Sequence, residues 1–189
     1  MRMTVAVFPG SFNPPTLAHR AIVDSVLSDK RIDRVDLTLS LDALNKPRHT
    51  QASLGTRCDL LVQVFDDEPR CRIVLTSERL LADIARDYDY LVLGADKALQ
   101  LHDPIYYSSL EEMRDKLARL PELIVFDRDQ YQTLNSDPHW SLPEPLRLAS
   151  STKVRAGSWE LVPTIIRSQC QAIYGTDQQL DKSSDDQRS

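Results

Sequence analysis

The sequence predicts an α/β protein, a Rossmann-like doubly wound parallel sheet with helices on both faces. Two observations lead to this prediction. Short apolar runs typical of buried parallel strands alternate with segments whose apolar residues recur at helical spacing, and no apolar run approaches the length of a membrane span. Strands that alternate with helices form right-handed βαβ units, which assemble into one parallel sheet. Ligands of such sheets bind at the carboxyl ends of the strands.

The first half of the chain contains two strand–helix pairs. A strand is expected over residues 3–8, an apolar run closed by a Pro-Gly pair, and an amphipathic helix over 17–27. Residues 35–41 alternate apolar and polar side chains, which predicts a strand with one covered face. A second helix is expected over 54–65, where helical spacing is shared by Leu54, Cys58, Leu61, Val62 and Phe65.

The alternation continues in the second half of the chain. A short strand is expected at 72–75 and a helix at 80–85. The continuous apolar run at 90–93 is typical of a central parallel strand, as is the run at 123–126. Between them, residues 110–120 predict a helix with one charged face.

The remaining residues predict the end of a single domain and a tail. Three prolines between residues 136 and 145 indicate a loop, and a short strand is expected at 146–149. A last helix is expected over 163–174, with Pro at its start. The polar composition after this helix is typical of disorder. We therefore expect one domain over residues 1–175 and a disordered tail over 176–189.

Composition narrows the class of protein. A chain of 189 residues can bury a sizeable core, and its net charge of -5 with a pI near 5.4 argues against general nucleic-acid binding. Three cysteines without C-x-x-C spacing (Cys58, Cys71 and Cys170) indicate reduced thiols rather than a zinc site. The first residues do not resemble a secretory leader. We expect a cytoplasmic protein that binds neither membranes nor nucleic acids.

Residues 10–19 are the most informative part of the chain. They read Gly-Ser-Phe-Asn-Pro-Pro-Thr-Leu-Ala-His and join the first strand to the first helix. Gly10 allows phosphate oxygens to approach the backbone, and N–H groups around Ser11 and Phe12 can donate to them. His19, in the first turn of the helix, can donate to charge that develops on phosphorus. This junction indicates phosphate chemistry.

A second polar segment lies far along the chain, at residues 150–155. It reads Ser-Ser-Thr-Lys-Val-Arg. Ser and Thr favour the N-cap of a helix, where backbone N–H groups lack partners, and Lys153 and Arg155 add positive charge nearby. We expect this segment to fold against the loop at 10–19, so that both contribute to one site for a triphosphate.

Both motifs resemble those of the T/H-x-x-H nucleotidyltransferases. The first resembles their G-x-F-x-P-x-[HT]-x-x-H loop, with Thr16 in place of the first His as in the nicotinamide mononucleotide adenylyltransferases. The second resembles their S-x-T-x-x-R motif. Residues 94–96, Gly-Ala-Asp, are similar to the G-[SA]-D that follows a strand in the family. The order of elements agrees along most of the chain, whereas residue identities are specific mainly in the first two motifs.

The resemblance implies transfer of AMP from ATP to a phosphate-bearing acceptor, with nicotinate or nicotinamide mononucleotide as the first choice. His19 would contact the α-phosphate, and Thr16 would add a hydroxyl. Asp96, placed by Gly94, would accept hydrogen bonds from the ATP ribose. An acceptor that is already anionic needs no general base, and Mg²⁺ would be carried by phosphate oxygens and water. The β- and γ-phosphates would be held by Lys46, Ser150, Ser151, Thr152 and Arg155.

The acceptor pocket does not match the family pattern. Bacterial nicotinate mononucleotide adenylyltransferases usually carry Y-T-x-x-T-L after the third strand and a Trp beyond the G-A-D helix, whereas the corresponding segments here are 78–83 and 102–107. Tyr106 and Tyr107 are candidates to stack on a pyridine ring, and packing in the core is the alternative. Trp140 and Trp159 are weaker candidates for the ring. Arg128 corresponds to an arginine often found at this point of the family, and an exposed surface arginine is the alternative.

Other functions stay open at this point. Phosphopantetheine is an alternative acceptor, although those adenylyltransferases are usually shorter. Cytidylyltransferases rank lower because their H-x-G-H and R-T-x-G-I-S-T-T motifs are absent. A catalytically silent nucleotide-binding regulatory protein is a further alternative, suggested by the missing pyridine-site motifs. A dinucleotide-dependent oxidoreductase is disfavoured because no G-x-G-x-x-G follows the first strand. The partners expected are small molecules, and a homo-oligomer is possible.

Overall fold

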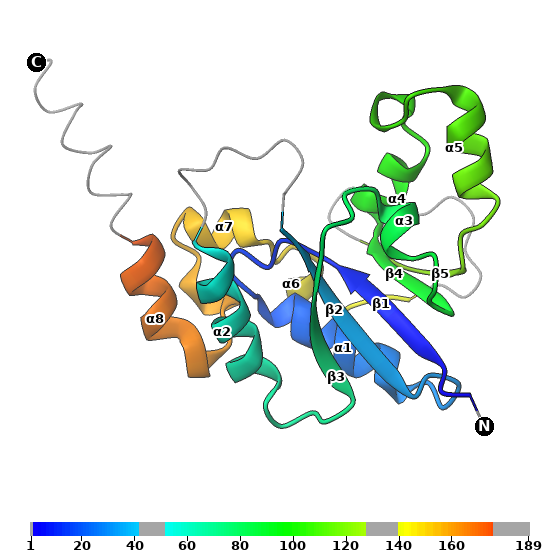
Figure 1. The fold of residues 1–189 in the computed structure, drawn as a ribbon. Coiled ribbons are helices and arrows are strands. Elements are labelled where there is room, and N and C mark those ends of the chain that lie inside the picture. The colour runs from blue at the N-terminus through cyan, green and yellow to red at the C-terminus, as the bar shows by residue number, and fades with distance from the viewer. Residues whose placement is uncertain (1, 42–51, 128–139, 176–189) are drawn as a thin grey trace, which may run out of the picture.

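The computed structural model describes residues 2–41, 52–127 and 140–175. Its centre is a five-stranded parallel sheet with strand order β3-β2-β1-β4-β5 (Figure 1). The strands are β1 (Val5–Pro9), β2 (Arg34–Ser40), β3 (Cys71–Thr76), β4 (Tyr90–Gly94) and β5 (Glu122–Phe126). The chain moves outward from β1 in both directions, so the topological switch point, where ligands bind in such sheets, lies between β1 and β4.

The connections between the strands are mostly helical. Between the strands lie α1 (Leu17–Ser28), α2 (Leu54–Phe65), α3 (Leu81–Ile84), α4 (Ala95–Leu101), the 3-10 turn η2 (Pro104–Tyr106) and α5 (Leu110–Leu117). After β5 follow α6 (Glu144–Arg147), α7 (Ser151–Arg155), the 3-10 turn η3 (Trp159–Leu161) and α8 (Thr164–Tyr174). The strands and the longer helices therefore lie where the hydrophobic pattern predicts them, within a few residues at each end.

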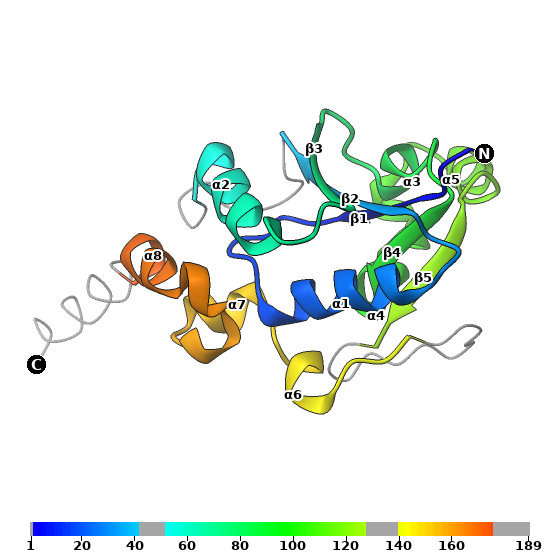
Figure 2. The same cartoon turned by 90° about the horizontal axis from the view of Figure 1, so that it is seen from below.

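Alternating side chains of the strands supply two separate cores. On β1, Ala6 and Phe8 belong to the larger cluster, which includes the buried faces of α1, α2 and α8. Val7, between them in sequence, belongs to the smaller cluster with Leu91 of β4 and Leu101 of α4. Since successive side chains of a strand point to opposite faces, the two clusters lie on opposite sides of the sheet. Figure 2 shows α1 on one side and α3 and α5 on the other, which confirms helices on both faces.

One predicted strand is wrong. Residues 146–149 do not join the sheet, because the chain forms helix α6 over Glu144–Arg147 and then a turn. The N–H groups of Leu146 and Arg147 donate to the Pro143 carbonyl at 2.9 and 3.2 Å, which closes the first turn. Proline suits this place because its fixed φ fits the start of a helix and its missing N–H is not needed there.

The C-terminal part of the described chain packs beside the second helix. α8 begins at Thr164 with Pro163 as its N-cap residue, one position later than expected, and lies against α2 in both views (Figures 1 and 2). Within the described ranges, no helix is long and apolar enough to cross a membrane. The predicted disordered tail over 176–189 lies outside the described residues.

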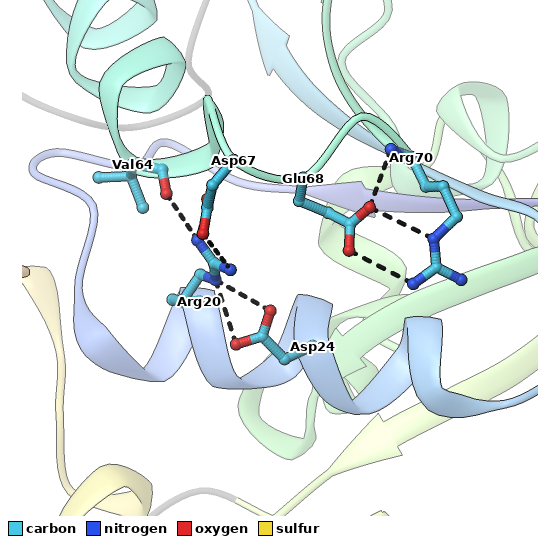
Figure 3. A network of polar contacts seen from close by, with 6 residues as sticks. All are labelled: Arg20, Asp24, Val64, Asp67, Glu68 and Arg70. Atoms are coloured by element: carbon cyan, nitrogen blue, oxygen red, sulfur yellow. Dashed lines mark hydrogen bonds and ion pairs between the residues drawn. The ribbon is translucent and has the colours of Figure 1, made fainter.

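A network of charged side chains fixes α1 against the end of α2 (Figure 3). The Arg20 guanidinium donates to Asp24 at 2.9 Å, to Asp67 at 2.6 Å and to the Val64 carbonyl at 2.9 Å. The hydrogen bonds to Asp67 in particular raise the pKa of Arg20, and Arg20 in turn lowers the pKa of the Asp67 carboxyl. The network holds α1, and with it the histidine one residue before Arg20, in a defined position relative to the sheet.

Candidate active site

The loop after β1 is shaped by a buried aromatic ring. The Gly10 N–H donates to the Thr38 carbonyl at 3.1 Å, which holds the turn beside the end of β2. Phe12 follows with a φ of 43°, in the left-handed region, and its ring is buried edge-on against Phe8 and His19, with ring centroids 5.6 and 5.0 Å apart. A Cβ on Gly10 would lie 2.7 to 3.0 Å from atoms of that ring. Glycine is therefore required here by Phe12 as well as by any phosphate that approaches the turn.

His19 is held by a capping box at the start of α1. The backbone N–H of Thr16 donates to His19 Nδ1 at 2.9 Å, and the Thr16 side chain is the N-cap acceptor of the helix. Since Nδ1 accepts this hydrogen bond, the neutral imidazole carries its proton on Nε2. The capping box therefore fixes both the ring and its tautomer, and Nε2 can act as a hydrogen-bond donor. Thr16 itself is fully buried, and both its backbone and its side chain contact His19.

The segment at 150–155 folds onto this loop, as the two motifs lead us to expect. Ser151 Oγ donates to the Pro14 carbonyl at 2.8 Å, and the Arg155 guanidinium donates to the Asn13 carbonyl. Ser150 is the N-cap residue of α7 and accepts from the N–H of Lys153 at 3.2 Å. Thr152 Oγ1 accepts from Arg155 at 3.3 Å. The two motifs, about 140 residues apart, therefore form one surface, which confirms the predicted contact between them.

Two further helices hold the same loop. Tyr174 of α8 donates its hydroxyl to Asn13 Oδ1 at 2.7 Å, and burial raises the pKa of this tyrosine. Arg57 of α2 donates to the Ser11 carbonyl at 2.9 Å. The loop is therefore fixed by side chains from α2, α7 and α8 as well as by its own capping box. Such fixed geometry is what a site that stabilises a transition state requires.

Asp96 lies at the end of the neighbouring strand. Gly94, the last residue of β4, is the N-cap of α4, and Asp96 lies in the first turn of that helix. Because β4 pairs with β1, this turn lies beside the loop that carries His19. Asp96 Oδ1 is buried and has no hydrogen-bond partner among the described residues. A buried carboxylate oxygen without a donor is costly in an isolated protein, and a ligand hydroxyl would satisfy it.

A cavity of about 320 Å³ opens at the carboxyl ends of β1 and β2. One part of its lining is apolar and aromatic, from α3, α4 and η2: Leu80, Leu81, Ile84, Leu101, Tyr106 and Tyr107. The other part contains the cations Arg57, Arg79 and Lys97, and no acidic residue is among its described lining. Cationic side chains beside an apolar wall favour a ligand that joins an anionic group to a flat apolar one.

Of the loop at 10–19, only the first two residues line the cavity. Gly10 and Ser11 line the cavity, whereas His19, Asp96 and α7 do not. Gly10 and Ser11 are therefore common to the cationic cavity over β1 and β2 and to the loop that carries His19, which α7 contacts.

The sequence candidates fall into three groups. Tyr106 and Tyr107 line the cavity, and the Tyr107 hydroxyl donates to the Leu101 carbonyl at 2.8 Å. Trp140 and Trp159 pack against the larger core and do not line the cavity. Lys46 and Arg128 lie outside the described residues.

The sequence analysis missed the cavity's cations. Arg57 had a recognisable signal, because its spacing from Leu60, Leu61 and Val64 places it on the buried face of α2. For Arg79 and Lys97 no local pattern exists, since their meeting depends on the tertiary fold. In the described ranges, no group of three or more His, Cys, Asp or Glu side chains could hold a metal ion.

The chain is similar to known nucleotidyltransferases. A family model described as cytidylyltransferase-like matches residues 7–157. The chain is 28% identical over 148 residues to a probable nicotinate-nucleotide adenylyltransferase of Sulfurimonas denitrificans, covering 67% of this chain and 79% of the relative. It is 25% identical over 136 residues to a phosphopantetheine adenylyltransferase of Bacteroides fragilis, covering 71% and 85% of the two chains.

A solved structure shows the same fold. The nicotinic acid mononucleotide adenylyltransferase of Plasmodium falciparum, complexed with NaAD, superposes with a TM-score of 0.59 at 16% identity. The superposition covers 82% of this chain and 83% of that one. The similarity therefore extends across the sheet and its helices and confirms the predicted α/β architecture.

Proposed function

The chain belongs to the cytidylyltransferase-like family, and from this premise we propose that it transfers AMP from ATP to a pyridine mononucleotide and releases pyrophosphate. The acceptor is nicotinate or nicotinamide mononucleotide. The observation that carries the proposal is that Gly10 and Ser11 line a cavity with cationic and aromatic walls and also begin the loop that carries His19 and contacts α7. The two ligands react at Gly10 and Ser11, where the cavity borders the loop that carries His19.

ATP lies against the starts of α1, α7 and α4 in this proposal. Asp96 Oδ1, which is buried and lacks a partner among the described residues, accepts from the ribose hydroxyls. His19 Nε2 donates to the α-phosphate, and Thr16 sets its tautomer. Ser151 and Arg155 hold the loop in place, while Lys46, Ser150 and Thr152 assist with the β- and γ-phosphates. Several relatives are named adenylyltransferases, which supports ATP as the nucleotide.

Mg²⁺ enters this proposal as part of the nucleotide substrate. Its preferred ligands are oxygens, and it commonly keeps several waters and binds substrate phosphates. The described side chains provide no cluster that would hold the ion by themselves, so we expect phosphate oxygens and water to carry it. No role assigned to a protein residue depends on the ion.

The acceptor occupies the cavity. Tyr106 and Tyr107 contact its ring, and its phosphate lies near Ser11. A phosphate oxygen attacks the α-phosphorus in line, a new P–O bond forms, and the bond to the β-phosphate oxygen breaks with its electron pair leaving on pyrophosphate. The attacking oxygen is anionic at neutral pH, so the protein positions the reactants and stabilises the charge without a general base.

Phosphopantetheine is the second candidate acceptor. The relatives named phosphopantetheine adenylyltransferases match the chain over a similar length, and the apolar part of the cavity would also accept a pantetheine arm. The aromatic pair at 106–107 favours a flat ring and places the pyridine mononucleotides first. The sequence further predicts a cytoplasmic location, and a homo-oligomer stays possible.

Pyrophosphate release tests the proposal directly. The purified protein is incubated with MgATP or MgCTP and one of four acceptors: nicotinate mononucleotide, nicotinamide mononucleotide, phosphopantetheine and glycerol 3-phosphate. We expect release with MgATP and a pyridine mononucleotide. Release only with phosphopantetheine would move the acceptor assignment to the second candidate. ATP binding without turnover on every acceptor would contradict the proposal and indicate a silent nucleotide-binding protein.

A further inference from the structure

Arg57 is a buried cation with few hydrogen-bond partners among the described residues. It lies in the first turn of α2, and its side chain lines the cavity with only 5% of the residue exposed. One terminal nitrogen donates to the Ser11 carbonyl, and Nε has no hydrogen-bond partner among the described residues. In the part of the chain that the structure describes, no carboxylate lies within ion-pair distance of its guanidinium.

The surroundings of Arg57 do not compensate its charge. The groups that face it are the Tyr174 hydroxyl and the Cys58 thiol, neither of which is anionic at neutral pH. Burial lowers the pKa of Arg57, although an arginine remains charged under ordinary conditions. A buried charge without a counter-ion is costly, and proteins rarely keep one unless a ligand pairs with it.

A purely structural role does not explain an arginine at this position. Holding the Ser11 carbonyl requires one donor, which a neutral amide side chain can supply. The guanidinium offers five donors in a planar fork, the geometry that matches two oxygens of a phosphate. Its contact with Ser11 also holds it at the turn where the cavity meets the His19 loop.

We infer that Arg57 binds the phosphate of the acceptor and is the residue that selects phosphate-bearing acceptors over the corresponding nucleoside. This inference rests on the proposed function and adds a residue to it. The buried fork pairs with two phosphate oxygens and leaves the third to face the α-phosphorus. Without the acceptor phosphate, Arg57 would remain buried and unpaired, so a nucleoside binds poorly as well as lacking the nucleophile.

Arg57→Gln tests the inference because glutamine can still donate to the Ser11 carbonyl but carries no charge. Kinetics with varied acceptor and with varied MgATP are compared with binding of the acceptor alone, measured by calorimetry without ATP. We expect the KM and the Kd for the mononucleotide to rise roughly 30-fold or more, while the KM for ATP changes less than about threefold. Wild-type protein should bind the mononucleotide much more tightly than its nucleoside, and the variant should lose most of that difference.

Two further variants keep the test decisive. Arg57→Lys retains the charge without the fork, and we expect a rise in acceptor KM of roughly tenfold, so this variant carries the test if the glutamine variant unfolds. Arg72→Gln changes an exposed arginine of β3 and should leave both constants unchanged. Thermal unfolding of each variant reports whether it folds.

The outcomes separate this inference from the function on which it rests. Wild-type turnover combined with an unchanged acceptor KM and Kd in folded Arg57 variants would overturn the inference and leave the function intact. An equal rise in the KM of acceptor and ATP would also overturn it, because it would show a general disturbance of the loop. Wild-type protein that neither turns over nor binds any phosphate-bearing acceptor would overturn the function, and the inference with it.

Discussion

Two arginines on neighbouring helices of the same core differ in how far the protein itself satisfies their charge. Arg20 of α1 is partly exposed, binds two carboxylates and a backbone carbonyl, and lies over the Phe65 ring (Figure 3). Arg57 of α2 is buried and has a single backbone carbonyl as its partner among the described residues. The chain satisfies the charge of the first, whereas we propose that an anionic ligand pairs with the second.

The same contrast separates the carboxylates of the two regions. Asp67 pairs with Arg20 on the surface, whereas Asp96 has a buried oxygen without a described partner at the end of β4. The region of satisfied charges lies around α1 and the end of α2, whereas the unpaired atoms of Arg57 and Asp96 lie near the carboxyl ends of the central strands. Substitutions in the first region should therefore change stability, and those in the second should change catalysis or ligand binding.

His19→Ala should have the largest effect on catalysis. Loss of the Nε2 donor removes a hydrogen bond that strengthens as charge develops on the α-phosphate, and kcat should fall about a hundredfold or more. Pyrophosphate release measures the effect, and circular dichroism and thermal unfolding show whether the variant keeps its fold. A folded variant with near-wild-type turnover would remove His19 from the mechanism.

Gly10→Ala should disturb the loop itself. The new Cβ would lie within 3.0 Å of three atoms of the Phe12 ring, and because that ring is buried we expect a loss of about 1–3 kcal/mol in the free energy of unfolding, with lower kcat. Chemical denaturation measures the loss.

Gly55→Ala is the matched control for this substitution. A Cβ there would meet only Ser53 Oγ, at 3.8 Å, in the first turn of α2. Alanine is the better helix former, so stability should hold or rise slightly. If the two alanine variants were equally stable, the close packing of Phe12 on Gly10 would not be the reason for glycine in the loop.

Asp96→Asn should weaken ATP binding selectively. An amide keeps the shape of the carboxylate but is a poorer acceptor for two ribose hydroxyls, so the KM for ATP should rise roughly tenfold while the acceptor KM stays unchanged. The preference for ATP over 2′-deoxy-ATP, measured as a ratio of kcat/KM values, should shrink in the variant. An unchanged preference would place the ribose away from Asp96.

Arg20→Gln should lower the free energy of unfolding by about 1 kcal/mol and leave catalysis unchanged. The loss is small because the carboxylates that pair with Arg20 are largely exposed. The pKa of Asp67 is lowered by Arg20, so their interaction stabilises the fold fully above the ordinary aspartate pKa of 3.8. As the pH falls through the lowered pKa of the folded state, this stabilisation is lost. The difference between wild type and variant should therefore shrink in acid.

Denaturation curves at pH 7 and at successively lower pH measure this difference. Arg72→Gln, on an exposed position of β3, provides a baseline for loss of a surface charge. A difference that grows in acid would contradict the assigned ion pair, and a large rise in acceptor KM for Arg20→Gln would contradict the division between the two regions.

The sequence predicts the scaffold well because hydrophobic periodicity follows from local geometry. The helix expected over 54–65 has those bounds in the structure, and the loop at 10–19 meets the segment at 150–155 as expected. The error at 146–149 has a local cause, since two leucines separated by one residue resemble a strand, while Pro143 and Pro145 favour the start of a helix.

The site was predictable only in part because its cavity combines side chains from several distant elements. In α2 the apolar pattern placed Val62 on the buried face, yet it is 52% exposed, whereas Arg57 is buried. Because the pattern considers only apolar residues, it does not detect a buried arginine on the inner face of α2. The approach of Lys97 and Tyr106 to the end of β1 is likewise a property of the fold, which no local spacing encodes.

The central claim is that the loop at 10–19 and α7 hold a triphosphate on one side of the first turn while the cationic cavity holds the acceptor on the other. A crystal structure of the protein with α,β-methylene-ATP and nicotinate mononucleotide measures this directly. We expect the α-phosphate next to His19 Nε2, the ribose on Asp96, and the acceptor phosphate on the Arg57 guanidinium. A triphosphate bound in the cavity, or one remote from α7, would contradict the claim.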